Sequence, residues 1–337
     1  MKTEILTTHN KVLFEAAVKR AAERLRAGEV VALPTETVYD LAANALDAAA
    51  VAKIFQVKGR PAHNPIIVHV VGNEMAQACT SNWPETATAL ARAFWPGPLT
   101  LVLPRAKNIP DNVTAGGETV GIRWPGHPLM QAVIRECGFP LAAPSANLSN
   151  QVSPTNAQHV RAQLEGKISL IVDGGQSQVG IESTVLDLTA SPAKILRPGM
   201  IHASAIAAVC GGVQEPAAGG MPGEPVLRSP GMLEKHYSPK ARLVVWDWRD
   251  EADLRSQISA GSVPLSAVHI IAHTKIPAGF APENVSVIPH DAEAFARALY
   301  GELHRCDAAK AGLIVVEAPP ESPAWSGIAD RLRRAAA

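Results

Sequence analysis

The chain has few cysteines and no long apolar run. Its 337 residues include 4 cysteines, at positions 79, 137, 210 and 306, and none of them has CxxC spacing. This pattern argues against a zinc ribbon and a disulfide scaffold, and it favours reduced, mostly buried thiols. The first twenty residues are too polar for a signal peptide, and no later segment offers about 20 uncharged apolar residues for a membrane span. We therefore expect a soluble, cytoplasmic protein with no membrane contact.

An excess of charge of either sign is also missing, and aromatic residues are rare. Lys plus Arg and Asp plus Glu both number 31, and Phe, Trp and Tyr together make up 4% of the chain. Without net charge, the whole molecule is not drawn to nucleic acid or to an anionic membrane, so any basic site must be local. The hydrophobic share of 47% can fill two cores at this length, which predicts about two domains.

The spacing of apolar residues predicts an α/β fold with a large mixed sheet. Helices are expected over residues 11–27, 47–58, 85–94, 129–136, 156–164 and 203–209. Strands are expected over residues 30–33, 66–71, 99–103, 119–123, 169–172, 184–188 and 194–196. Because helices and strands alternate irregularly, a regular doubly wound βαβ repeat is not expected.

A change of composition after residue 209 divides the chain. Residues 210–241 are rich in Gly and Pro, which indicates a linker between a first domain at 1–209 and a second at 242–337. In the second domain, strands are expected over residues 243–246, 268–272, 286–288 and 313–316, and a helix over residues 291–306. This pattern predicts a smaller α/β domain.

The stretch from Leu33 to Val70 carries the clearest indication of a site. It gathers Thr, Glu, Lys, Arg, Asn and His around two apolar segments, without a Gly-rich loop of either common nucleotide-binding type. Lys58 and Arg60 follow a predicted helix and precede the apolar run 66–71, so both cations can extend over one strand edge. Such a pair suits phosphate oxygens and predicts a phosphate-bearing ligand. Alternatively, the two cations only complement the helix dipole.

Several motifs then occur in order along the chain. They are PTETVY at 34–39, KGRPAHNPIIVH at 58–69, TVGIRWPGHP at 119–128, PSANLS at 144–149, SPT at 153–155, IESTVLDL at 181–188, ILRPG at 195–199 and SPGMLEKHYSPKARL at 229–243. Together they resemble the YrdC-like family of threonylcarbamoyl-AMP synthases, in the long form with an extra C-terminal domain. Ordered motifs over about 200 residues are far more specific than one short pattern.

The resemblance implies a nucleotidyltransferase that forms threonylcarbamoyl-AMP and pyrophosphate from L-threonine, bicarbonate or CO2, and ATP. In the family, this product supports the N6-threonylcarbamoyladenosine modification of tRNA, so downstream tRNA threonylcarbamoyl transferase proteins and a weak tRNA contact are the implied partners. The implied fold is a twisted mixed-sheet YrdC-like domain with a basic concave face, followed by a smaller Rossmann-like domain. Mg2+ is expected with the triphosphate, although no protein ligand to it is named and Glu36 is at most an indirect contributor.

The resemblance also implies roles for individual residues. Catalysis falls to Lys58, Arg60 and Arg123. The implied threonine contacts are Thr37, His69, Arg123, Ala143 and Ser183. The implied ATP contacts are Lys58, Arg60, Asn64, Thr119, Ser145, Asn147, Ser153, Arg197 and His236.

Structural explanations compete with some of these roles. A His among valines is often only a structural residue, Arg123 could form a surface ion pair, and Asn147 could simply brace its loop through hydrogen bonds to the backbone. His236 and Tyr237 lie in the linker, which the resemblance implies folds over the active site, and the competing interpretation is an anchor on a domain surface. We expect this segment to be a lid that protects a labile adenylate from water.

The sequence departs from the family pattern at three positions where the family has a small residue. Asp40 and Ala43 stand in VYDLAANA where the family has glycine or another small residue, and Ala62 replaces a common serine. A non-glycine residue at positive φ costs about 1 kcal/mol or more, and a carboxylate near the phosphates could repel ATP. On these grounds Asp40→Gly is expected to preserve or improve activity.

Two other functions use the same type of domain. A non-catalytic RNA-binding module would hold RNA phosphates on the basic concave face, although neutral net charge and few aromatics disfavour it. A carbamoyltransferase using carbamoyl phosphate or another amine is disfavoured because the companion segments expected of hydrogenase-maturation relatives are absent.

Overall fold

The chain folds into two compact units. The computed structural model describes residues 2–215, 236–261 and 263–337. Of these residues, unit 1 contains those up to Ser149 and from Ser153 to Glu215, and unit 2 contains Asn150–Val152 and those from His236 to the end. Unit 1 carries all but one of the motifs described above, so the site is built there.

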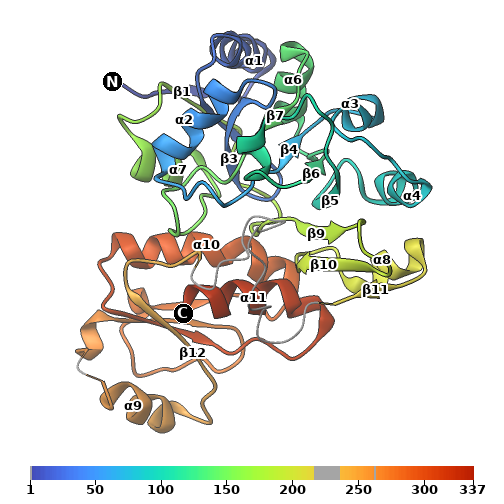
Figure 1. Ribbon diagram of the computed structural model, residues 1–337. Helices are drawn as coiled ribbons and strands as arrows, with labels where there is room; N and C mark the ends of the chain where they lie inside the picture. Colours follow the sequence, from blue (N-terminus) through green and yellow to red (C-terminus); the bar gives the residue numbers. More distant parts are fainter. Residues whose placement is uncertain (1, 216–235, 262) are drawn as a thin grey trace. The chain divides into compact units, whose positions relative to one another are not determined.

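Unit 1 is organised around a mixed sheet of eleven strands (Figure 1). Its order is β1-β8-β2-β3-β7-β4-β6-β5-β9-β10-β11. The strands are β1 (Glu4–Thr7), β2 (Val31–Pro34), β3 (Tyr39–Asn44), β4 (Val68–His69), β5 (Leu99–Pro104), β6 (Thr119–Arg123), β7 (Leu141–Ala142), β8 (Leu170–Asp173), β9 (Thr184–Asp187), β10 (Ala193–Arg197) and β11 (Val213–Gln214). Parallel and antiparallel neighbours occur together, as the irregular spacing of the sequence predicts.

The helices of unit 1 begin and end at recognisable cap residues. The Asn10 side chain caps α1 (Lys11–Arg26), and the Asp47 side chain accepts two backbone N–H groups at the start of α2 (Ala48–Lys58). Gly59 ends α2 at φ 59°, a left-handed conformation that glycine adopts without steric strain. The remaining helices are α3 (Asn73–Ala78), α4 (Glu85–Phe94), α5 (Asp111–Thr114), α6 (Pro128–Cys137), α7 (Ala157–Leu164) and α8 (Ala203–Cys210).

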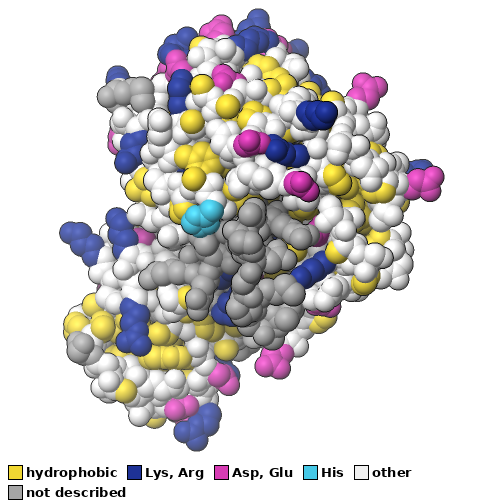
Figure 2. All heavy atoms as spheres, in the orientation of Figure 1, with side chains coloured by type: hydrophobic (Ala, Val, Ile, Leu, Met, Phe, Trp, Pro, Cys, Tyr) yellow, Lys and Arg dark blue, Asp and Glu magenta, His cyan; other side chains and the backbone are white. Residues whose placement is uncertain are grey.

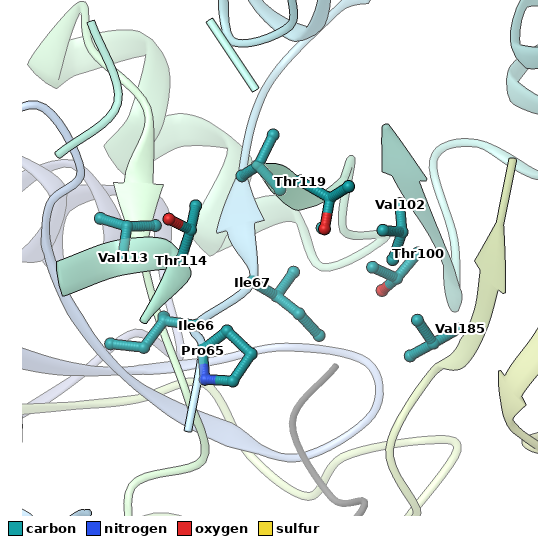
Figure 3. Close-up of a pocket in the computed structure, with 11 residues that line it drawn as sticks. Pro65, Ile66, Ile67, Thr100, Val102, Val113, Thr114, Thr119 and Val185 are labelled. Atoms are coloured by element: carbon teal, nitrogen blue, oxygen red, sulfur yellow. The ribbon is translucent and has the colours of Figure 1, made fainter. Parts of the chain in front are cut away.

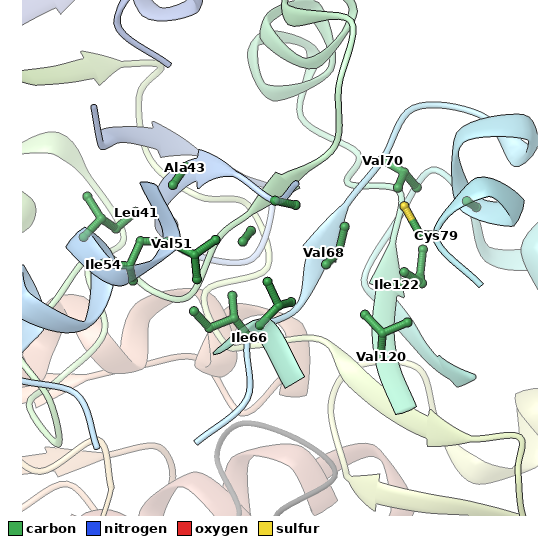
Figure 4. Close-up of a cluster of buried hydrophobic side chains, with 14 of the residues drawn as sticks. Leu41, Ala43, Val51, Ile54, Ile66, Val68, Val70, Cys79, Val120 and Ile122 are labelled. Carbon is green, nitrogen blue, oxygen red and sulfur yellow. The ribbon is translucent and has the colours of Figure 1, made fainter. Parts of the chain in front are cut away.

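Alternation along the strands gives the sheet two different faces. On β3, Leu41 and Ala43 join the core that also contains α2, α4 and α7, whereas Ala42 joins a second core with α1 and α6. Figure 4 shows Leu41, Ala43, Val68 and Ile122 in the first of these cores. Because neighbouring strand residues point to opposite faces, Asp40, His69 and Arg123 must point away from the first core.

Unit 2 is a smaller α/β unit with a parallel sheet of four strands in the order β12-β15-β13-β14. The strands are β12 (Arg242–Trp246), β13 (Val268–Ala272), β14 (Val285–Val287) and β15 (Leu313–Glu317), and the helices are α9 (Glu251–Ser259), α10 (Ala292–Ala308) and α11 (Ser326–Ala335). Short 3-10 turns occupy Leu265–Ala267, Pro282–Asn284 and Pro323–Trp325. The predicted α/β class is confirmed for both units.

The structure also differs from the predicted elements in specific ways. The predicted strand 66–71 is reduced to Val68–His69, and the N–H of Ile66 donates instead to the Val113 carbonyl oxygen in α5. Strands β1, β3, β7 and β11 were not predicted, and helices α3, α5, α9 and α11 were not predicted either. Part of the expected linker at 210–241 is regular, since β11 pairs with β10, while residues 216–235 lie outside the described part.

Two expectations about composition can be compared with the described residues. All four cysteines are free thiols, and Cys79, Cys137 and Cys306 are buried, as predicted. Among the described residues, no helix combines the length and apolar character that crossing a bilayer requires.

Candidate active site

The candidate site lies on the face of the unit 1 sheet opposite the α2 and α4 core. Helices α1 and α6 pack on this face over β8, β2 and β3. Toward β6, β5 and β9, its apolar content among the described residues is a small separate cluster of Val102, Val185 and Leu196. Polar groups occupy the remainder, and the predicted residues on this face include His69 and Arg123, which are register partners on β4 and β6.

Lys58 is buried beside the PSANLS loop. The last turn of α2 carries it, and its side chain is 2% exposed. The ammonium donates to the carbonyl oxygens of Ser145 and Asn147, the latter at 2.5 Å, which brings these three predicted ATP contacts together. Burial, and then the nearby Arg60 charge, hold the pKa of Lys58 well below its usual range. The ammonium is therefore enclosed by carbonyl oxygens and does not extend over an open strand edge.

Arg60 holds the loop that carries Asn64. Its Nε donates to the Asn64 carbonyl oxygen at 3.1 Å, and its Nη2 donates to the Pro65 carbonyl oxygen at 2.6 Å. The Asn64 side chain is 1% exposed, and neither its amide oxygen nor its amide nitrogen has a hydrogen-bond partner in the structure. An unsatisfied buried amide is uncommon and points to a ligand that completes it.

Arg123 already faces a carboxylate of the protein. Its Nη2 lies 2.8 Å from Glu36 Oε1, and its Nε donates to the Gly97 carbonyl oxygen at 3.3 Å. Both residues of this ion pair have little exposure, 3% for the Arg123 side chain and 14% for that of Glu36. Nη1 makes no hydrogen bond to any residue that the structure describes. Arg123 therefore does form an ion pair, but this pair is largely buried, so the alternative of an ion pair on the surface is wrong.

Asp40 and His69 form a second buried pair beside Arg123. His69 Nε2 lies 3.8 Å from Asp40 Oδ2, and both side chains are almost fully buried. Burial raises the pKa of Asp40 to about 8, with the Arg123 charge opposing this shift. Burial and then the Arg123 charge hold the pKa of His69 well below its usual range. Both groups therefore favour their neutral forms near neutral pH.

The remaining predicted contacts form two smaller groups. Arg197 donates from Nε to the Ser183 carbonyl oxygen and from Nη2 to Ser183 Oγ, both at 3.1 Å, and Ser183 Oγ lies 2.8 Å from Thr100 Oγ1. Ser153 Oγ donates to Glu182 Oε1 at 2.6 Å. The bonds of Arg197 connect the ILRPG and IEST motifs around Ser183, a predicted threonine contact, and the bond of Ser153 connects the SPT and IEST motifs.

Four further contacts complete the description of the predicted residues in unit 1. Thr37 Oγ1 is 2.9 Å from Thr35 Oγ1, and Ala143 is buried with its N–H donating to the Ile67 carbonyl oxygen. The Asn147 side chain donates to the Leu148 carbonyl oxygen, as expected of a residue that braces its loop. Thr119 lines a fissure with Ile67, Thr100 and Val185 (Figure 3). The volume of this fissure is about 10 Å³, which corresponds to one water molecule.

His236 lies in unit 2, where it packs on Tyr237. The two ring centroids are 4.0 Å apart at an edge-on angle of 86°, and the His236 N–H donates to the Arg334 carbonyl oxygen at 3.2 Å. Tyr237 stacks on Tyr300 at 5.9 Å, and the Arg331 guanidinium lies over its ring. His236 is thus anchored in unit 2, while its predicted contact with ATP stays a prediction.

The backbone explains one departure from the family pattern. Asp40 and Ala43 lie in the regular strand β3, and neither is among the described non-glycine residues with positive φ. The backbone strain that a positive φ would cause at Asp40 is therefore absent. Sequence reasoning also missed that Glu36 is the partner of Arg123, that Glu182 is the acceptor of Ser153, and that Thr100 is the neighbour of Ser183. Glu36 and Glu182 were detectable as acids inside motifs already singled out.

Two family models together match nearly the whole chain. The Sua5/YciO/YrdC model, described as telomere recombination, matches residues 23–199. A model described as the threonylcarbamoyl-AMP synthase C-terminal domain matches residues 201–337. The two matches meet near the end of β10 and support a chain of two family domains.

Relatives of similar length match along the chain as well. A threonylcarbamoyl-AMP synthase of Pyrococcus abyssi is 39% identical over 325 residues, covering 95% of this chain and 94% of that protein. A threonylcarbamoyl-AMP synthase of Bacillus subtilis is 41% identical over 322 residues, covering 95% of this chain and 92% of that protein. A crystal structure of Pyrococcus abyssi Sua5 complexed with L-threonine superposes with a TM-score of 0.89 at 36% identity, covering 99% of this chain and 98% of that one. The chain therefore belongs to the Sua5/YrdC family of threonylcarbamoyl-AMP synthases, in the long form with an additional C-terminal domain.

Proposed function

We propose that unit 1 binds L-threonine and ATP on the polar face of its sheet and joins them, through bicarbonate, into threonylcarbamoyl-AMP with release of pyrophosphate. The observation that supports this proposal most directly is a group of buried charges and unsatisfied polar atoms in unit 1. Lys58 and Arg123 are each 2% exposed, and the side-chain polar atoms of Asn64 and His69 have no hydrogen-bond partner. Burying such groups is unfavourable unless a polar ligand completes their interactions.

Arg123 receives the threonine carboxylate in this proposal. Its Nε faces the Gly97 carbonyl oxygen, and one N–H of Nη2 faces Glu36. The outer end of the guanidinium, with Nη1, is then left for the carboxylate of threonine. A planar guanidinium suits a carboxylate held by two parallel bonds, and such a charged contact contributes about 1.5–3 kcal/mol. His69 and Ser183, from β4 and the loop before β9, then face the amino and hydroxyl ends of the amino acid.

Lys58 and Arg60 hold the triphosphate. Burial disfavours the charged form of Lys58, and a neighbouring anionic phosphate favours that form again. The triphosphate would thereby offset the cost of burying the charged form of this lysine. The unsatisfied amide of Asn64 lies on the loop that Arg60 holds, which suits a contact with the nucleotide.

Mg2+ has a limited role in this proposal. Among residues 2–215, 236–261 and 263–337, no group of three His, Cys, Asp or Glu side chains is placed to hold a metal ion. Nearby carboxylates are engaged, since Glu36 faces Arg123 and Glu182 accepts from Ser153. These residues do not fit a protein cage for the ion, which matches the preference of Mg2+ for phosphate oxygens and water.

No protein nucleophile is required for this reaction. The carbamate oxygen attacks the α-phosphorus of ATP, and pyrophosphate leaves. Such transfers are accelerated mainly by holding the partners in line and by neutralising phosphate charge, and positioning alone can supply about 7–11 kcal/mol. The buried cations, hydroxyls and amides of unit 1 are consistent with that requirement. Downstream, we propose that proteins that modify tRNA consume the adenylate.

Pyrophosphate release tests the proposal. The purified chain should release pyrophosphate from ATP only when threonine and bicarbonate are both present, and omission of either should abolish turnover. Lys58→Met should lose most of this activity, whereas Lys53→Met, on the same helix but bonded to the Gly28 carbonyl oxygen, should retain it. Release of pyrophosphate without threonine, or equal activity in both variants, would contradict the proposal.

RNA binding without catalysis is the alternative outcome of the same experiment. On the face drawn in Figure 2, Lys and Arg side chains are interspersed with Asp and Glu and do not form one continuous basic patch. Together with 4% aromatic residues, this distribution does not favour a non-specific RNA surface. Salt-sensitive retention of RNA without turnover would instead support that alternative.

A further inference from the structure

A groove of about 850 Å³ in unit 1 shares no lining residue with the candidate active site. It lies across the starts of three neighbouring parallel strands, β1, β8 and β2. One wall is formed by residues 2–5 at β1 and another by residues 53, 56 and 57 of α2. Binding sites for ligands commonly have volumes of about 300–1,000 Å³, so the groove is large enough to hold an occupant.

The floor of this groove is apolar. Val30 and Ile168, which directly precede β2 and β8, are buried in the core that also contains α2 and α4. Ile5 and Val57 are half-buried against the same core and also line the groove. Part of their apolar surface therefore stays accessible to an occupant, which would gain free energy by covering it.

The acidic side chains of the groove already have basic neighbours. Glu29 Oε1 lies 2.8 Å from Arg24 Nη1, which also belongs to the groove. Glu4 Oε2 lies 4.0 Å from Arg20 Nε. The charges of both acids are thereby compensated within unit 1, and they do not neutralise the remaining basic residues of the groove.

Three lysines of the groove, Lys2, Lys53 and Lys167, have no such compensation. In the described part of the chain, none of them has an acidic side chain within ion-pair distance. Lys53 donates only to the Gly28 carbonyl oxygen, at 2.6 Å, and this bond uses one of its three N–H groups. Because the lysines come from three separate segments, their charges suit several acidic groups spread along an occupant better than one compact anion.

The groove also reaches β1, the last strand at this end of the sheet. The Glu4 N–H donates to the Ser169 carbonyl oxygen at 2.9 Å, so the peptide groups of Glu4 face β8. Neighbouring residues of a strand direct these groups to opposite sides, so the N–H and C=O of Ile5 face outward. On that side β1 pairs with no strand among the described residues. An extended chain can form backbone hydrogen bonds at such an edge.

We propose that this groove is a docking site for an extended acidic segment of a partner protein. Apolar side chains of the segment would rest on the floor, and its carboxylates would face the three lysines. An apolar centre with a charged rim is the usual arrangement of a protein interface. A nucleotide fits the groove less well, because it concentrates its charge on one phosphate group. The inference does not depend on the reaction proposed for unit 1.

A labelled peptide tests this proposal. Fluorescence anisotropy measures binding of fluorescein-labelled Glu-Leu-Glu-Val-Glu-Leu-Glu to the full chain at about 50 mM salt, where exposed charges are weakly screened. Binding should weaken as salt is added. A peptide with lysine in place of glutamate should not bind, because its charge is reversed. A peptide with serine in place of leucine and valine should bind more weakly, because it cannot cover the apolar floor.

Substitutions in the groove then locate the binding. The combined change Lys2→Met, Lys53→Met and Lys167→Met removes three charges and keeps the aliphatic stems. Each exposed ion pair changes Kd by up to about 5-fold, so the triple variant should bind the acidic peptide about 10-fold more weakly. Gln56 is exposed on α2, so changing its charge should not disturb folding. Gln56→Lys should tighten binding, and Gln56→Glu should weaken it, by about 2- to 5-fold each.

A matched control removes the same net charge elsewhere in unit 1. Lys11, Lys19 and Lys107 lie outside the groove, and replacing all three by methionine should leave the Kd of the peptide unchanged. Pyrophosphate release should be equal in the groove variants and the unmodified chain. Failure of the proposed function would therefore leave the binding test intact.

Three results would overturn the docking site. One is a Kd above about 1 mM for the acidic peptide on the unmodified chain. Another is an equal loss of affinity in the groove variant and the control variant. The third is displacement of the peptide by AMP, together with loss of AMP binding in the groove variant, which would identify a site for a small anion instead.

Discussion

Replacing Asp40 by asparagine should change how the stability of unit 1 depends on pH. Asp40 has a folded-state pKa of about 8, well above the ordinary value of 3.8, because burial disfavours its charged form. Between these two values the folded protein keeps the proton and the unfolded chain releases it. Stability therefore falls as pH rises, by about 1.4 kcal/mol per pH unit for one group. From pH 5 to pH 7 the unmodified chain should lose about 2.7 kcal/mol relative to Asp40→Asn.

Urea unfolding of both proteins at several pH values measures this difference directly. Other groups titrate too, including His69, but subtracting the two curves isolates the contribution of Asp40. Hydrogen exchange at the amides of β2 and β3 separates unit 1 from unit 2, because these strands flank the substituted position. Parallel stability curves for the two proteins would show that Asp40 is ionised in the folded state. The reasoning about its burial would then fail, whatever the enzyme assays show.

Three other substitutions test separate parts of the structure. Arg123→Lys removes the planar fork, so the Kd for threonine should rise about 10- to 100-fold by calorimetry while that for ATP stays constant, and an unchanged threonine Kd would exclude the carboxylate contact. His236→Ala should raise the KM for ATP or the rate of adenylate hydrolysis, and unaltered kinetics would remove the lid hypothesis. Gly59→Ala forces an alanine to φ 59° and should destabilise unit 1 by about 1 kcal/mol in urea unfolding, whereas equal stability would show that the end of α2 relaxes freely.

Elements with strong local signals were predictable from the sequence. Helix α2 has an Asp cap, an apolar face and a glycine stop, and it was predicted within one residue. Strand β6, at residues 119–123, and helix α4, at residues 85–94, match the predictions at both ends. Strand β3 was missed because YDLAAN contains no β-branched residue, and its strand conformation depends on pairing with β2 and β7.

The site was predictable as a set of residue types but not as an arrangement. The motifs identified Lys58, Arg60 and Arg123, and the structure places all three among the buried charges of unit 1. Their partners depend on contacts between distant segments, such as Glu36 with Arg123 and Ser145 with Lys58. Local patterns carry no information about such pairs. For the same reason, the sequence could raise the question of Asp40 without showing that His69 lies beside it.

The assignment of Asn150–Val152 to unit 2 has a consequence for how the protein can be divided. Their neighbours on both sides, Ser149 and Ser153, belong to unit 1, so the polypeptide crosses between the units three times. Gln151 pairs with Ser238, whose N–H donates to the Asn150 carbonyl oxygen at 2.9 Å. A truncation after residue 209 would delete that partner and release the short segment between the PSANLS and SPT motifs. Unit 2 is thereby joined, through covalent continuity, to two loops that carry proposed nucleotide contacts.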